Sequence, residues 1–183
     1  YESYEGSKVY KSINGGESWT NVTGSGLNGE NITNIEYQRG SYGGIYLGTR
    51  KNVYYKNDVM TEWILFNNGL PASTYSTQLV PYYKEGKIKN GTNRSAWQAD
   101  FYETSNPSAQ AAADKLTINC MNDTVQFVDH SAISNVSATW AWSFPGGTPS
   151  SSAEQNPQVV YSEEGYYTVS LIITDAYGFD SQV

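Results

Sequence analysis

The sequence has very few of the residues that most often carry chemistry. Its 183 residues include one cysteine, Cys120, and one histidine, His130. A single cysteine excludes a disulfide within the chain and a zinc site built from several cysteines. Cys120 alternates with Leu116 and Ile118, which predicts a buried and inert thiol. His130 follows a predicted strand, so we expect a surface turn residue there rather than a catalytic base.

Basic residues and long apolar runs are also scarce. The chain has 11 Lys and Arg residues and 18 Asp and Glu residues, and its formal net charge is −7. This balance argues against a nucleic-acid partner, because phosphates require a basic face. No run of about 18 apolar residues occurs, so we expect no membrane-spanning helix.

Aromatic and turn-forming residues, by contrast, are abundant: the chain has 16 Tyr, 5 Trp and 17 Gly. This composition favours an all-β protein. Tyrosines could stack on sugar rings, but half-buried strand positions explain them better. Because neighbouring strand residues face opposite ways, one member of the pair Tyr54 and Tyr55 is expected to be exposed. The chain starts at Tyr1 rather than Met, and we expect it to be a piece of a longer protein.

The first half of the chain contains a repeat of about 44 residues. "VYKSINGGESW" begins at Val9 and "VYYKNDVMTEW" begins at Val53, which places Trp19 and Trp63 at the same offset. Periods of about 40–50 residues that carry several short strands are typical of propeller blades.

Short strands separated by turn residues support this interpretation. One complete four-stranded blade is predicted from the strands 32–38, 44–49, 52–56 and 62–66. The segments 8–12 and 18–23 would end an earlier blade, and three strands of a later blade are predicted over 77–83, 86–92 and 95–101. Propellers protect free edges by closing into a ring. We therefore expect residues 1–101 to be the closing blades of a β-propeller whose other blades lie upstream.

The segment "SINGGESW" lies between two of these strands and resembles the Asp-box, or BNR repeat, Ser/Thr-x-Asp-x-Gly-x-Thr/Ser-Trp. Ser12, Gly16, Ser18 and Trp19 match the pattern, and Asn14 stands where the Asp belongs. An Asx side chain accepts hydrogen bonds from following backbone N–H groups, and glycine supplies positive φ. The resemblance implies a structural turn on the outer rim of a propeller, with the indole packed over the hairpin.

Families with such blades include sialidases, glycosidases that cleave xyloglucan, and sortilin-type receptors, so the resemblance implies a fold and not one activity. A glycosidase would use paired carboxylates. Glu36 is the most interesting candidate, because its predicted strand would line the channel. A sialidase needs three arginines, and Arg39, Arg50 and Arg94 are scattered along the chain. We predict no catalytic residue in this stretch.

The second half begins with a change of composition. Residues 102–114 contain small residues and Pro107, which predicts an extended linker. Period-2 alternation follows over 115–120, 124–129, 137–144 and 166–174. Residues 115–183 are therefore predicted to form an immunoglobulin-like antiparallel sandwich.

This second half resembles a PKD (polycystic kidney disease) repeat. The hallmark W-x-F-G-D-G falls on Trp142, Ser143, Phe144, Pro145, Gly146 and Gly147. The later part of the motif falls on Asn156, Pro157, Tyr161, Gly165, Tyr167, Val169 and Leu171. The resemblance implies a sandwich core made of Trp142, Phe144, Gly147, Tyr161, Gly165 and Tyr167.

Some PKD repeats bind calcium through acidic residues that include the Asp of the G-D-G turn. That position is Gly146 here, and Asp175 and Asp180 remain near the end of the sheet. Calcium prefers about six to eight oxygen ligands. Two carboxylates do not make such a cage, so we predict no metal and no other cofactor.

Together these observations predict a non-catalytic part of a secreted or cell-surface multidomain protein. The architecture resembles bacterial surface proteins of the Bacteroidetes type. Spacing, adhesion, or binding of polysaccharide or of other surface proteins are the expected roles, and the upstream blades are the expected partner within the chain. The alternative is the tail of a glycoside hydrolase whose catalytic residues lie mainly upstream.

Overall fold

The structure is a computed structural model that describes residues 8–27, 29–118, 122–134 and 137–183. Two compact units make up the chain: one takes in the residues up to Tyr82 together with Gly86–Glu103, and the other takes in Tyr83–Glu85 and Thr104–Val183. Strands dominate both units, which confirms the predicted all-β class. Within the described residues, no helix is long and apolar enough to cross a membrane.

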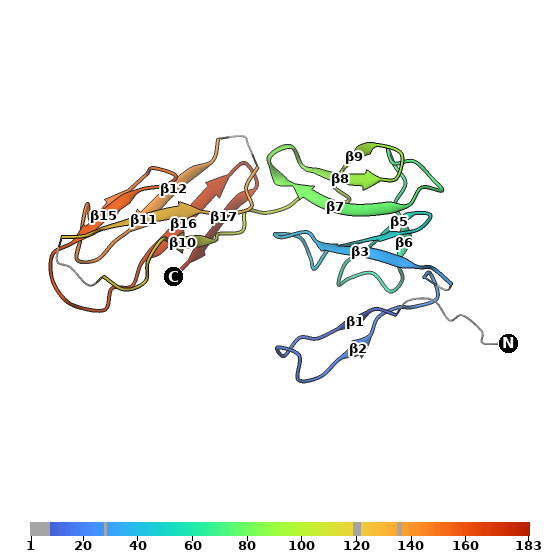
Figure 1. Cartoon of the computed structure of the whole chain (residues 1–183), viewed down its shortest axis with the longest axis horizontal. Coiled ribbons are helices and arrows are strands. Elements are labelled where there is room, and N and C mark those ends of the chain that lie inside the picture. The colour runs from blue at the N-terminus through green and yellow to red at the C-terminus, as the bar shows by residue number, and fades with distance from the viewer. Residues whose placement is uncertain (1–7, 28, 119–121, 135–136) are drawn as a thin grey trace. The chain divides into compact units, whose positions relative to one another are not determined.

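The described part of the first unit forms separate antiparallel sheets that follow one another along the chain (Figure 1). The first sheet pairs β1 (Tyr10–Lys11) with β2 (Thr20–Asn21). The second is the meander β3 (Ile32–Tyr37), β4 (Ile45–Thr49), β5 (Val53–Lys56) and β6 (Ile64–Leu65). The third is β7 (Ser76–Tyr82), β8 (Lys87–Thr92) and β9 (Ala96–Asp100). The predicted runs of four and three short strands are confirmed, and the described sheets do not close into a ring.

The two central strands of the middle sheet, β4 and β5, are buried on both faces. Tyr46 pairs with Tyr55, and Leu47 pairs with Tyr54, so the two pairs point to opposite sides. Tyr46 and Tyr55 pack in one apolar cluster with residues of β7, β8 and β9. Leu47 and Tyr54 pack in another with Val9. The expectation that one of Tyr54 and Tyr55 is exposed is therefore wrong: they are 9% and 0% exposed, because a sheet covers each face.

Glu103 fastens the end of the first unit to this sheet. Its carboxylate accepts hydrogen bonds from the Tyr55 hydroxyl at 2.8 Å, the Tyr42 backbone N–H at 3.0 Å and Asn57 Nδ2 at 3.1 Å. The Tyr102 ring stacks on the Tyr55 ring at 4.5 Å. Burial, followed by the neighbouring Glu103 carboxylate, raises the pKa of the Tyr55 phenol far above its usual value. The sequence predicts a linker over residues 102–114. In the structure these bonds hold Tyr102 and Glu103 in the first unit.

The two tryptophans of the repeat lie in different surroundings. Trp63 is 5% exposed and donates from Nε1 to the Val22 carbonyl at 2.8 Å. Trp19 is 62% exposed. Trp63 packs in an apolar cluster with Val9 and Tyr54, whereas Trp19 lies in the turn before β2.

The second unit is a sandwich of two antiparallel sheets over its described residues. One sheet has the order β10 (Ala111–Ala113), β11 (Thr124–Asp129), β15 (Gln158–Tyr161) and β13 (Gly147–Thr148). The other has the order β14 (Ser151–Ser152), β12 (Thr139–Ser143), β16 (Ser170–Asp175) and β17 (Gly178–Gln182). Their inward side chains form one cluster around Phe127, Trp142 and Phe144, as the alternating pattern predicts.

The start of this sandwich differs from the sequence prediction. The described residues of 115–120 form no strand, and Leu116 is 95% exposed. The edge strand is instead Ala111–Ala113, inside the predicted linker, and it pairs with β11. Ala109, Ala111 and Ala113 pack against the core in period-2 alternation, and their small size concealed the pattern. Cys120 lies outside the described residues.

We predict that Glu103→Ala lowers the free energy of unfolding of the first unit by about 1–3 kcal/mol, because the buried Tyr55 hydroxyl loses its acceptor. Urea unfolding of the full chain, followed by tryptophan fluorescence, measures the change. Glu17→Ala is the matched control, because Glu17 is exposed, and its effect is expected to stay within about 0.5 kcal/mol. Equal losses in the two variants would contradict the proposed fastening role.

Candidate functional site

The predicted PKD core residues meet in the centre of the second unit. Trp142 is 2% exposed and donates from Nε1 to the Glu154 carbonyl at 3.0 Å. Its ring stacks on Phe144 with centroids 5.6 Å apart, and Phe127 packs against both rings. Aromatic pairs of this kind contribute about 0.5–1.5 kcal/mol beyond their buried area. This part of the motif is a fold element rather than a site.

The turn after β12 explains the departure from the G-D-G hallmark. Gly146 has a φ of +77°, and a Cβ at this position would lie 2.2 Å from Cε1 of Tyr167. The ring of Tyr167 occupies the space that an aspartate side chain would need. A Cβ at Gly147 would likewise lie 2.5 Å from Cγ1 of Val159. The turn is therefore shaped around packing and not around an acidic ligand.

Tyr161 and Tyr167 form a stacked pair with ring centroids 4.7 Å apart. The Tyr167 hydroxyl donates to the Glu163 carbonyl at 3.0 Å. Among the described residues, the buried Tyr161 hydroxyl has no hydrogen-bond partner. Burial, followed by the nearby Tyr167 phenol, raises the pKa of Tyr161. A Cβ at Gly165 would lie 3.2 Å from the Tyr167 ring, so a bulkier residue there would press on the pair.

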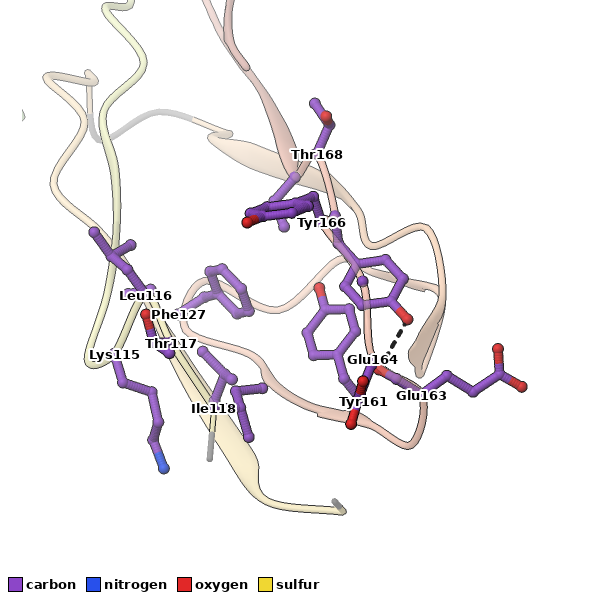
Figure 2. A pocket seen from close by; sticks show the side chains of 15 residues that line it. Lys115, Leu116, Thr117, Ile118, Phe127, Tyr161, Glu163, Glu164, Tyr166 and Thr168 are labelled. Carbon is purple, nitrogen blue, oxygen red and sulfur yellow. Dashed lines mark hydrogen bonds between the residues drawn. The ribbon is translucent and has the colours of Figure 1, made fainter. Parts of the chain in front are cut away.

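These tyrosines form part of the wall of a hollow with a volume of about 710 Å³. Figure 2 shows Leu116 and Ile118 on one side, with Tyr161 and Tyr166 on the other and Phe127 between them. This volume lies in the range of small-ligand pockets, which are mostly apolar with a few polar groups. The hollow is the candidate functional site of the second unit.

The lining of the hollow includes one basic and two acidic residues. Glu163 and Glu164 are exposed. Lys115 donates to Asp123 at 2.7 Å. This ion pair lowers the pKa of Asp123.

The described lining of the hollow combines apolar and aromatic side chains with carboxylates at exposed positions. Within the described ranges, no three His, Cys, Asp or Glu side chains group together to hold a metal ion.

Sequence reasoning identified Tyr161, Gly165 and Tyr167 as core residues but did not find the hollow. The sequence feature that could have indicated the hollow is "SEEGYY". In this segment two acidic residues and a further tyrosine, Tyr166, adjoin the motif residues. Tyr166 is fully exposed, unlike its neighbour Tyr167.

With this geometry in place, comparison with known families gives one match. Residues 104–183 match the family model of the PKD domain. The span agrees with the second unit, and its start before 115 agrees with the edge strand at Ala111–Ala113. The hollow therefore lies within the stretch that matches the PKD domain model.

Comparison with curated proteins found no match. Among solved structures, the chain is similar to the extracellular domain of a hybrid two component system from B. thetaiotaomicron, with a TM-score of 0.38 and 13% identity over 88% of this chain and 25% of that chain. A second structure from the same organism, of an extracellular domain described under a one component system, gives a TM-score of 0.37 and 12% identity over 86% of this chain and 24% of that chain. The chain thus spans about a quarter of the length of these structures.

The residues of "SINGGESW" form a closed hydrogen-bond network. The Asn14 side-chain oxygen accepts from the Ser18 backbone N–H at 3.0 Å, and Asn14 Nδ2 donates to Ser18 Oγ at 3.0 Å. Ser12 Oγ accepts from the Gly16 N–H at 2.8 Å, and Gly16 has a φ of +96°. Trp19 Nε1 donates to the Gly16 carbonyl at 3.0 Å, which holds the indole over the turn.

The remaining candidate residues do not come together at one site. Burial raises the pKa of Glu36 on β3. His130 is exposed, and its backbone N–H donates to the Gln110 carbonyl. Asp175 accepts from the Ser134 and Tyr177 backbone N–H groups, and Asp180 accepts from the Ala109 N–H. These carboxylates hold backbone segments in place.

We predict opposite outcomes for two single-hydroxyl deletions in the PKD core. Tyr167→Phe loses the bond to the Glu163 carbonyl and is expected to cost about 0.5–1.5 kcal/mol. Tyr161→Phe removes a buried hydroxyl without a partner, so its free energy of unfolding stays equal or rises. Chemical denaturation of both variants measures the difference, and a larger loss for Tyr161→Phe would contradict this reading of the pair.

We also predict that Asn14→Ala lowers stability by about 0.5–2 kcal/mol, because the turn N–H loses its acceptor. Asn14→Asp keeps the acceptor oxygen and is expected to restore stability to within about 0.5 kcal/mol of the parent chain. Thermal unfolding of the three chains makes the comparison. Equal stability of the parent chain and Asn14→Ala would mean that the side chain does not hold the turn.

Proposed function

We propose that the chain is a non-catalytic segment of a secreted or cell-surface multidomain protein. Its role is spacing or adhesion, with carbohydrate or protein as the bound partner. The observation that carries this proposal is the PKD domain match over residues 104–183, on a sandwich whose large hollow has apolar walls. The resemblance of the predicted architecture to bacterial surface proteins of the Bacteroidetes type adds to it.

The first unit is proposed to be the closing part of an Asp-box propeller of the sialidase or sortilin type. The meander order of β3 to β6, the face-to-face packing of the sheets and the "SINGGESW" network support this proposal. Ile35 and Tyr37 on β3 are about half exposed. In a propeller, upstream strands would cover such residues, and the third sheet would receive a fourth strand.

A second candidate function is the tail of a glycoside hydrolase. Glu36 is the observation that favours it, since its carboxyl has a raised pKa on the innermost strand of its proposed blade. A general acid in such an enzyme requires a raised pKa. It also requires a second carboxylate within about 5–10 Å, and in this proposal that partner lies upstream.

Two measurements test the proposal. Antibody labelling and protease treatment of intact producing cells are expected to reach the chain, and protection from both would overturn the extracellular assignment. The purified protein with its upstream blades, assayed on a panel of aryl glycosides and polysaccharides, is expected to show no hydrolysis. Turnover that Glu36→Gln abolishes and Glu17→Gln preserves would establish the hydrolase alternative instead.

A further inference from the structure

The chain contains a dipeptide that can change its own covalent structure without an enzyme. When glycine follows asparagine, no side chain hinders the glycine nitrogen, and it can close a five-membered ring on the asparagine amide. The described residues contain three such pairs, which are Asn14–Gly15, Asn68–Gly69 and Asn90–Gly91. A fourth asparagine of this kind, Asn28, lies outside the described residues. The three described pairs differ in local structure, and this difference decides which of them can react.

Hydrogen bonds hold the side chains of Asn14 and Asn90 in place. The side-chain oxygen of Asn14 accepts from the Ser18 backbone N–H and from Ser12 Oγ, each at 3.0 Å, and its Nδ2 donates to Ser18 Oγ at 3.0 Å. Asn90 is 2% exposed on β8, and its side-chain oxygen accepts from Ser76 Oγ at 2.7 Å. The ring can close at either residue only after these bonds break, and at Asn90 water must also reach a buried strand.

Asn68 has no such restraint. It lies in the turn between β6 and β7, and both it and Gly69 are exposed. Among the described residues, no hydrogen bond engages the Asn68 side chain or the Gly69 backbone N–H. Gly69 has a φ of +75°, in a region that glycine enters and leaves readily. The attacking nitrogen, the amide that it attacks and the solvent are therefore all available at this turn.

We propose that Asn68–Gly69 is a site of spontaneous deamidation, and that in the folded chain it reacts faster than the other described Asn–Gly pairs. The Gly69 backbone nitrogen loses its proton and attacks Cγ of Asn68. A bond forms between this nitrogen and Cγ, the bond from Cγ to Nδ2 breaks, and ammonia leaves a succinimide ring. Water then opens the ring at Cγ to give aspartate, or at the main-chain carbonyl carbon to give isoaspartate. The whole change consumes water and releases ammonia, and nothing is oxidised or reduced.

The isoaspartate product alters the main chain between two buried residues. Phe66 and Leu70 are each 6% exposed and pack in the same apolar cluster. Isoaspartate routes the backbone through its side chain, which adds an extra backbone atom between these two residues. The isoaspartate form is therefore expected to unfold at a lower urea concentration than Asn68→Asp, which carries the same new charge on an unaltered backbone. Equal urea midpoints for the two forms would overturn this consequence.

The test follows the folded full chain during incubation in ¹⁸O-labelled water at about pH 8.5 for about two weeks. Each event takes a labelled oxygen from the solvent, so mass spectrometry of fragmented peptides locates the events that occurred during the incubation. Asn68 is expected to react at least about five-fold faster than Asn14 or Asn90, because the bonds of those two side chains must first be lost. The rate at Asn68 is expected to rise with pH, since the attacking nitrogen must lose its proton.

Matched controls separate the effect of the fold from that of the dipeptide. In guanidinium-unfolded chain, the three pairs are expected to react at rates within about three-fold of one another, because local opening no longer limits any of them. Ser12→Ala combined with Ser18→Ala removes two of the bonds that hold Asn14. This double variant is expected to speed the reaction at Asn14 severalfold and to leave Asn68 unchanged. Asn68→Gln is expected to remove the labelled product at position 68, since its longer side chain would have to close a larger ring.

Two results would overturn the inference. The first is a folded chain in which Asn68 reacts no faster than Asn14 or Asn90. The second is a preference for Asn68 that persists unchanged in the unfolded chain, because the sequence and not the turn would then set the rate. Neither result bears on the extracellular assignment, which the labelling of intact cells tests separately.

Discussion

Burial of both faces of the two central strands of the middle sheet, β4 and β5, is the constraint on which the first unit depends. Tyr46 and Tyr55 fill one interface, and Leu47 and Tyr54 fill the other. A sheet in this position must be apolar on both sides, which accounts for consecutive tyrosines in the same strand. The Glu103 carboxylate completes the arrangement, because it satisfies the buried Tyr55 hydroxyl and links the end of the unit to the sheet.

The two units solve the same problem of covering sheet faces in different ways. The first stacks short meanders, each joined to the next by an apolar layer. The second closes two sheets over a shared cluster around Trp142 and Phe144, and covers its edge with a strand of alanines. Both units contain tryptophans whose indole N–H donates a hydrogen bond to another segment of the chain. These tryptophans are Trp63, Trp140 and Trp142.

Much of this could be predicted from the sequence, because strand and turn chemistry are local. The order of the strands in the first unit and the inward face of Trp142 and Phe144 follow from alternation and turn residues. Burial of Tyr54 could not be predicted, since it depends on a sheet contributed by distant residues. The edge strand at Ala111–Ala113 was missed because alanine alternation gives little hydrophobic contrast. The hollow was missed because its walls come from segments about forty residues apart.

Gly146, in the turn after β12, packs against the Tyr167 ring in the wall of the hollow. The ring fits there because glycine has no Cβ. A lineage that acquired an aspartate at position 146 would have to displace that ring, and with it the partner of Tyr161. Divergence at this single position would therefore force a choice between an acidic ion-ligating hairpin and an aromatic pocket.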